Sequence, residues 1–198
     1  MICVIDYNAG NLRSVQKALE ACGATTIVSS NPDDMRKADK VVFPGVGAFG
    51  KAMYTLEELQ LVDPIREVID EGKPFLGICL GLQLLHETSE ESPGVTGLSV
   101  IKGRVQRFSD QLKVPHLGWN VLIQRSSPLW NQVPDESYFY FAHSYYIQPS
   151  DNDIVTGESE YDGKFAVAIR RDNIFGLQFH PEKSQKYGLQ ILRNFIEL

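Results

Sequence analysis

A cysteine framed by two glycines constrains this chain more than any other feature. Gly77, Cys79 and Gly81 follow the G-x-nucleophile-x-G spacing of a nucleophile elbow, with sulfur in place of the serine oxygen. The apolar residues 75–78 predict a buried strand, and residues 80–87 predict a helix that follows it. Glycines suit both positions because bulky side chains there would collide with the sharp strand-to-helix turn.

Cys79 is therefore the candidate nucleophile. Unpaired N–H groups and the positive dipole end at a helix start favour a thiolate. The N–H of Leu80 would face the oxyanion that forms when the sulfur attacks a carbonyl. The alternative is a small buried hydrophobe, which is our interpretation of Cys3, in a strand, and of Cys22, at a helix end.

Composition limits the class of protein. The 198 residues, 43% hydrophobic and 22% charged, fit one globular domain over residues 1–198 without linker or repeat. The net charge of -6 argues against nucleic acid and anionic membranes as partners. We find no apolar run of bilayer length and no signal-peptide pattern at the N-terminus. Three widely spaced cysteines indicate neither a disulfide framework nor a metal site, and they favour the cytoplasm.

The first half of the chain alternates between strand and helix patterns. Short apolar runs predict strands at 1–6, 25–29, 40–43 and 75–78, with a turn at 7–11. Helices are expected at 12–22, from Asn31-Pro32, at 49–59 and from Asp63-Pro64 to Gly72. This βα alternation implies a parallel sheet covered by helices on both faces.

The rhythm changes after residue 94. Strands are predicted at 98–108, 119–124, 138–147, 154–159, 165–170 and 174–179, with hairpin turns at 161–164 and 171–173. A final helix has an apolar face at 189, 192, 195 and 196. The expected fold is a single-domain, flavodoxin-like α/β protein whose mainly parallel central sheet carries an antiparallel extension.

His180 and Glu182 complete a possible catalytic triad. Ligands of open parallel sheets bind outside the carboxyl ends of the strands, and His180 directly follows the strand 174–179. Pro181 fixes the turn, so that Glu182 can hold the other imidazole nitrogen and stabilise the imidazolium. Alone, each residue fits a surface loop better; beside an elbow nucleophile, the triad is the stronger interpretation.

The glycine-bracketed segment Pro44-Gly45-Val46-Gly47 is a candidate oxyanion loop. Its glycines permit close approach of backbone to ligand, and an N–H of Val46 or Gly47 would be a second oxyanion donor. The alternative is an ordinary tight connection, and the segment alone does not decide between them.

The remaining histidines carry weaker signals. We interpret His86, on the elbow helix, as structural, place His116 in a turn, and take His143, among aromatic residues, as a core group. No zinc-ligand spacing and no G-x-x-x-x-G-K-[ST] phosphate loop occurs, so we expect no metal, no cofactor and no ATP-dependent activation.

Taken in order, these segments resemble the class I, triad-type glutamine amidotransferase family over essentially the whole chain. The oxyanion loop, the G-x-C-x-G elbow and the C-terminal H-x-E carry the resemblance. Within the family, the chain looks like the glutaminase subunits of imidazole glycerol phosphate synthase. That likeness lies in residues 7–12, 44–50, 77–83, 116–120 and 140–145.

The resemblance implies hydrolysis of L-glutamine to glutamate and ammonia. Cys79 would attack the side-chain amide carbon, His180 would protonate the departing ammonia and then activate water against the thioester, and Glu182 would orient His180. The family's glutamine contacts fall on Gln83, Glu91, Ser144 and Tyr145, with a backbone contact at Gly47.

The resemblance also implies a heterodimeric partner. Ammonia is protonated in neutral water, so it should pass directly to an acceptor site. The family places that site on a (β/α)8-barrel cyclase subunit of histidine biosynthesis. The resemblance implies that the assembled synthase is a lyase. Asn11, Trp119 and Tyr138 are expected near that partner, although core packing remains open for the two aromatic residues. The oxyanion peptide, flanked by glycines, would rotate into place when the partner docks.

Three rival interpretations remain. The chain would also fit a glutaminase subunit for anthranilate, aminodeoxychorismate or pyridoxal phosphate synthesis, and the P-G-V-G segment argues against these. A cysteine peptidase or deglycase of related fold is a second rival. A catalytically silent binding subunit is the third, and the intact Cys79, His180 and Glu182 set argues against it.

Overall fold

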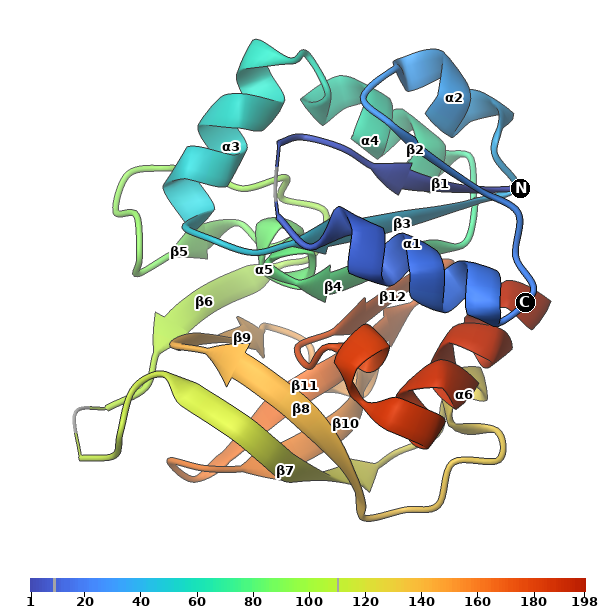
Figure 1. Ribbon diagram of the computed structural model, residues 1–198. Helices are drawn as coiled ribbons and strands as arrows, with labels where there is room; N and C mark the ends of the chain where they lie inside the picture. The colour runs from blue at the N-terminus through green and yellow to red at the C-terminus, as the bar shows by residue number, and fades with distance from the viewer. Residues whose placement is uncertain (9, 110) are drawn as a thin grey trace.

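The first half of the chain alternates between strands and helices as predicted (Figure 1). The structure is a computed structural model that describes residues 1–8, 10–109 and 111–198; the turn predicted at 7–11 includes Ala9, which lies outside the described residues. Its elements are β1 (Ile2–Ile5), α1 (Leu12–Ala21), β2 (Thr26–Ser29), α2 (Pro32–Lys37), β3 (Lys40–Gly45), α3 (Phe49–Glu58), α4 (Val62–Asp70), β4 (Phe75–Cys79) and α5 (Leu80–Leu84).

Local chemistry explains several of these boundaries. The Asn31 side chain accepts the N–H of Asp33 at 3.0 Å and so caps α2, whose first residue is Pro32. Gly23 and Gly72 have positive φ values of 94° and 81° just beyond α1 and α4, where a left-handed residue ends a helix.

The second half of the chain is mostly strand. Its elements are β5 (Thr88–Ser89), β6 (Gly103–Arg107), β7 (His116–Gln124), β8 (Ser137–His143), β9 (Tyr145–Pro149), β10 (Val155–Glu160), β11 (Lys164–Arg171), β12 (Ile174–Leu177) and α6 (Gln185–Glu197), with 3₁₀ helices η1 (Pro128–Trp130), η2 (Asn152–Ile154) and η3 (Pro181–Lys183). Among the described residues, no helix has the length and apolar character needed to cross a membrane.

The described strands join in the order β2-β1-β3-β4-β12-β11-β10-β7-β8; off this path, β9 pairs with β11, β6 with β9, and β5 with β6. The strands from β2 to β12 in this order run parallel, and the rest of the path is antiparallel, which confirms the expected fold class. Strand β12 lies beside β4 in parallel, with Gly176 opposite Gly77 and Leu177 opposite Ile78. The residues that follow β12 therefore emerge at the same sheet edge as Cys79.

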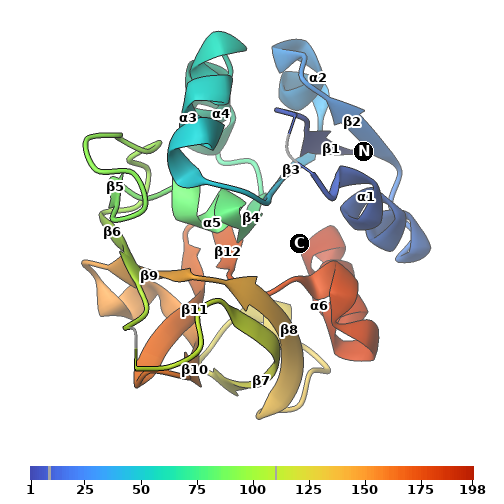
Figure 2. The same cartoon turned by 60° about the vertical axis from the view of Figure 1, so that its left-hand side comes forward.

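Helices cover both faces of the parallel strands, as expected. Buried residues of α2, α3 and α4 form one core cluster, and those of α1 and α6 form another on the opposite face. Figure 2 shows α1 and α6 next to each other, with α3 and α4 across the sheet. The C-terminal helix thus completes a layer that the N-terminal helix begins.

Three predicted elements are wrong in extent. The strand predicted at 98–108 is confined to β6, because the N–H groups of Leu98 and Ile101 instead bond the carbonyls of Leu84 and Leu85, each at 2.8 Å. These bonds satisfy the end of α5, which is five residues long rather than reaching residue 87. The strand predicted at 138–147 is two strands, interrupted at Ser144.

His116 is also placed differently from the prediction. It begins strand β7 and lies opposite His143 of β8, rather than in a turn. Residues 116–122 pair with all of β8. This strand pairing outweighs the local preference of the sequence around Gly118 for a turn.

Candidate active site

The predicted elbow forms at the junction of β4 and α5. Cys79 has a φ of 53°, in the left-handed region that non-glycine residues seldom adopt. A Cβ atom on Gly81 would lie 1.8 Å from the carbonyl oxygen of Phe43, and one on Gly77 would lie 3.0 Å from the backbone of Leu82. Position 81 therefore requires glycine, and position 77 leaves little room for a side chain, in line with the predicted spacing.

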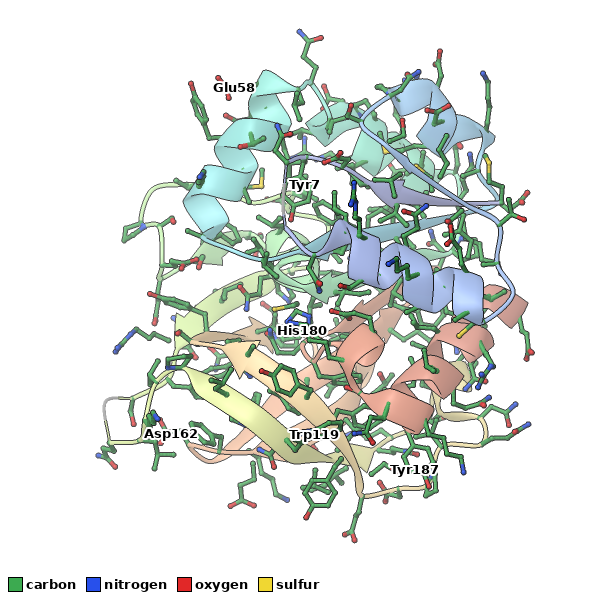
Figure 3. All side chains as sticks on the ribbon, in the orientation of Figure 1. Tyr7, Glu58, Trp119, Asp162, His180 and Tyr187 are labelled. Carbon is green, nitrogen blue, oxygen red and sulfur yellow. The ribbon has the colours of Figure 1, made fainter. Side chains whose placement is uncertain are left out.

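His180 and Glu182 converge on this corner. The Nδ1 atom of His180 lies 2.9 Å from Oε1 of Glu182, and the two side chains are 3% and 0% exposed. Since a carboxylate accepts, Nδ1 carries the proton, which leaves Nε2 as the ring atom available to the Cys79 side chain, whose interaction with the ring contributes to the raised pKa of His180. Figure 3 places His180 near the middle of the molecule, between the helical layers and the antiparallel strands.

The electrostatics of the site favour a charged imidazole. Burial alone would lower the pKa of His180, but hydrogen bonding and charge from Cys79 and Glu182 outweigh it and raise the pKa to about 10. The imidazolium is then the stable form at neutral pH, and its charge stabilises a thiolate beside it.

A second residue also bonds the Glu182 carboxylate. Its Oε1 atom also accepts a hydrogen bond from Nδ2 of Asn11 at 2.5 Å, a contact that spans 171 residues of chain. We predicted Asn11 near a partner, and no local sequence signal indicated this contact. The structure makes Asn11 a support of the triad carboxylate.

A small cavity opens beside the sulfur. Its volume is about 230 Å³, and its lining includes the five predicted glutamine contacts together with the candidate nucleophile: Gly47, Cys79, Gln83, Glu91, Ser144 and Tyr145. Pockets for drug-sized ligands measure roughly 300–1,000 Å³, so this one suits a smaller molecule. The structure thus gathers these residues from four separate segments around one space.

Two of these cavity residues also bond the protein itself. The Glu91 carboxylate accepts the N–H of Phe49 at 2.7 Å, at the start of α3, where the helix dipole favours an anion. The Gln83 amide donates to the carbonyl of Tyr145 at 2.9 Å and to Gln178 Oε1 at 3.1 Å. Sequence reasoning did not single out Gln178; its only signal was a polar residue in an apolar strand, two places before His180.

The candidate oxyanion loop lies against the elbow. Gly45 pairs with Cys79 across β3 and β4, and Val46, Gly47 and Leu80 all line the cavity. Gly47 has a φ of 114°, a conformation that L side chains rarely adopt. The loop is therefore in position to approach a ligand held at the sulfur.

Trp119 lies on β7 and Tyr138 on β8, and Figure 3 shows Trp119 away from His180. Their side chains are 46% and 61% exposed, so the core-packing alternative is wrong for both. They line a hollow together with residues 184–187.

Other predicted roles can be placed as well. Cys3 is fully buried in β1 and Cys22 is half-buried at the end of α1, as expected for small apolar residues. His86 is fully buried, and burial lowers its pKa to about 4. Within the described part of the chain, His, Cys, Asp and Glu side chains form no group of three or more that would hold a metal.

Comparison with known proteins yields consistent likenesses. The family model described as "Glutamine amidotransferase class-I" matches residues 3–198. The chain is 50% identical to "Imidazole glycerol phosphate synthase subunit HisH" of Methanocaldococcus jannaschii, with 100% of both chains covered. It is 52% identical to the protein of the same name from Moorella thermoacetica, over 100% of this chain and 94% of that one.

Solved structures show the same fold at lower identity. The structure described as "Crystal structure of glutamine amidotransferase" gives a TM-score of 0.79 at 18% identity and covers 100% of this chain and 98% of that one. "Structure of PurLQS from Thermotoga maritima" gives a TM-score of 0.74 at 19% identity, with 99% and 97% covered. At these identities the likeness concerns the fold.

Proposed function

The chain belongs to the class I glutamine amidotransferase family, and from this premise we propose that it is the glutaminase subunit of imidazole glycerol phosphate synthase, with residues 1–198 as one glutamine amidotransferase domain. It hydrolyses L-glutamine to glutamate and ammonia. The observation that carries the proposal is the Cys79–His180–Glu182 arrangement beside a small cavity, in a chain about half identical to full-length relatives of that name.

The reaction begins with attack of the Cys79 sulfur on the side-chain amide carbon of glutamine. The carbonyl oxygen becomes an oxyanion, for which the N–H groups of Leu80 and of Val46 or Gly47 are the proposed donors. His180, charged at neutral pH, gives its Nε2 proton to the departing amide nitrogen, and ammonia leaves.

Water then completes the reaction. His180, now neutral, takes a proton from water, which attacks the thioester carbon; glutamate leaves and the sulfur is released. Glu182 accepts hydrogen bonds from both His180 and Asn11, and it holds the proton of the ring on Nδ1. Gln83, Glu91, Ser144 and Tyr145 hold the amino-acid end of glutamine.

The ammonia passes to a (β/α)8-barrel cyclase subunit (HisF) as heterodimer partner. The exposed rings of Trp119 and Tyr138 support a docking face on β7 and β8, since exposed aromatic residues are enriched at protein interfaces. Asn11, on the Glu182 carboxylate, then relays the docked state to the triad. The three free cysteines support a cytoplasmic setting.

Glutamate release from glutamine tests the proposal. We expect slow turnover by the isolated chain, a large increase with the cyclase and its ligand, and a loss of roughly a thousandfold or more in Cys79→Ala. Cys22→Ala is the matched control, because this cysteine is half-buried at the end of α1, and it should keep full turnover.

Two outcomes would contradict the proposal. Undiminished turnover in Cys79→Ala would remove the thioester mechanism. Stimulation by an anthranilate or aminodeoxychorismate synthase subunit, and not by the cyclase, would assign the chain to another amidotransferase.

A further inference from the structure

We propose that Gln178 acts on the nucleophile: its side-chain amide donates a hydrogen bond to the Cys79 sulfur and holds Gln83 in place with the other end. The inference deepens the proposed function, because it takes Cys79 to be the nucleophile. It concerns a residue that lies between the end of β12 and His180, and that has no side-chain exposure to solvent.

The contacts of Gln178 point in two directions. Its Nε2 lies 3.7 Å from the Cys79 sulfur, within the range for a donor to sulfur, and its Oε1 accepts from Gln83 at 3.1 Å. The Cys79 and Gln83 side chains are 6% and 5% exposed. A carboxamide buried between two such groups is expected to hydrogen-bond both of them, because leaving its polar atoms unpaired there would cost free energy.

The orientation of this amide follows from one backbone carbonyl. Gln83 bonds the carbonyl oxygen of Tyr145 at 2.9 Å, and an oxygen only accepts, so the Gln83 atom there is its NH₂ group. The second hydrogen of that NH₂ faces Gln178, which must present its oxygen. The NH₂ of Gln178 is thereby turned toward the sulfur, and a flipped amide would place oxygen against a thiolate.

The Tyr145 carbonyl is also bonded by His143, which in turn is bonded by His116. His143 Nδ1 lies 2.8 Å from this oxygen and must donate, so its Nε2 accepts from His116 Nδ1 at 2.9 Å. His116 Nε2 then accepts from Asn120 Nδ2 at 3.2 Å. Asn120 Nδ2 also donates to the Glu160 carbonyl at 2.9 Å, which fixes the direction of the whole chain of bonds.

Both histidines remain neutral in this arrangement. Burial lowers the pKa of His116 to about 4 and, chiefly by desolvation, that of His143 to about 3. Each ring therefore keeps one donor and one acceptor across the physiological range. The chain of bonds that starts beside Trp119 and ends at the Cys79 sulfur stays intact in that range.

The effect of Gln178 adds to that of the charged groups around the sulfur. His180 supplies the positive charge, with Glu182 behind it. A hydrogen bond to an ionised group is stronger than a neutral one. Removing the Gln178 donor should therefore disfavour the thiolate even with His180 and Glu182 in place.

Alkylation of Cys79 by iodoacetamide tests this without glutamine or partner. The rate is followed from pH 5 to 10 on the full-length protein, with the modified cysteine identified by peptide mapping. We expect the midpoint of the profile to move up by about one pH unit in Gln178→Met, which keeps the length and loses the donor, equivalent to a tenfold lower thiolate fraction. Gln148→Met, at the exposed position of the otherwise buried or half-buried strand β9, should match the wild type.

Gln178→Glu separates donation from shape. It keeps an oxygen acceptor for Gln83 and, once ionised, turns a negative oxygen toward the sulfur, so its alkylation rate should fall below that of Gln178→Met as pH rises. Superimposable profiles for the wild type and both variants, with unchanged unfolding temperatures, would overturn the proposal. Failure of wild-type glutaminase activity would leave this comparison intact, so the two proposals fail separately.

Discussion

Nδ2 of Asn11 and Nδ1 of His180 bond the same oxygen atom of Glu182, at 2.5 and 2.9 Å. Asn11 stands at the start of α1 in a left-handed conformation, with a φ of 73°. The triad therefore has a fourth member, contributed by the first turn after the first strand. That member ties the position of α1 to the orientation of the catalytic base.

Removing the Asn11 side chain should lower turnover of glutamine. Asn11→Gly is the suitable change, because glycine tolerates the positive φ without strain. A hydrogen bond to a charged group contributes about 1.5–3 kcal/mol, so we expect kcat to fall roughly tenfold to a hundredfold. Asn8→Gly is the control: Asn8 is exposed, with a similar φ of 63°. Equal kcat in Asn11→Gly and wild type would make the contact dispensable.

Protonation of His180 should link stability to pH. Its folded-state pKa is raised to about 10 from an ordinary value of 6.5. The unfolded chain thus loses this proton first, so the stabilisation is complete below about pH 6.5 and is lost between there and about pH 10. Urea unfolding over that range should show a decline in wild type that is largely absent in His180→Gln. Parallel curves for the two proteins would contradict the raised pKa.

Gly81 should tolerate no side chain. A Cβ atom there would lie 1.8 Å from the Phe43 carbonyl, which is backbone and cannot turn aside. Gly81→Ala is expected to lose roughly 3 kcal/mol or more of unfolding free energy, in the range of severe overpacking. Gly23→Ala meets open space and bears only the left-handed penalty of roughly 1–2 kcal/mol. Equal losses would show that the elbow has room to relax.

The hydroxyl of Tyr7 should be dispensable for stability. It is buried and has no hydrogen-bond partner among the described residues, and burial raises its pKa, with a smaller contribution from Cys79. Tyr7→Phe removes an unpaired polar atom, so the unfolding free energy should stay level or rise by up to about 1 kcal/mol. A clear loss of stability, measured by urea unfolding, would reveal a bond to this hydroxyl in solution.

Much of the architecture was predictable because it depends on local pattern. Alternating apolar runs and turn residues located β1 to β4 and the helices between them, and the glycine spacing located the elbow at Cys79. The H-x-E spacing located His180 and Glu182, which lie only two residues apart in the sequence. Local spacing determines each of these features, so sequence alone carries them.

The missed features depend on contacts between distant segments. The contact of Asn11 with Glu182 and that of Gln178 with Cys79 both arise only when the sheet is assembled. Likewise, residues 98 and 101 leave the predicted strand because the carbonyls at the end of α5 need donors. These contacts join residues that lie far apart in the sequence, so no short stretch of sequence reveals them.

The position of β12 also determines when, during synthesis of the chain, the active site can assemble. The thiol corner is made by the middle of the chain, whereas the strand that delivers its proton carrier is added close to the C-terminus and slots in directly beside it. A polypeptide leaving the ribosome therefore carries Cys79 without His180 and Glu182 until the residues after β12 have been added. The chain can hydrolyse glutamine only once β12 has paired with β4. Incomplete chains therefore consume no glutamine.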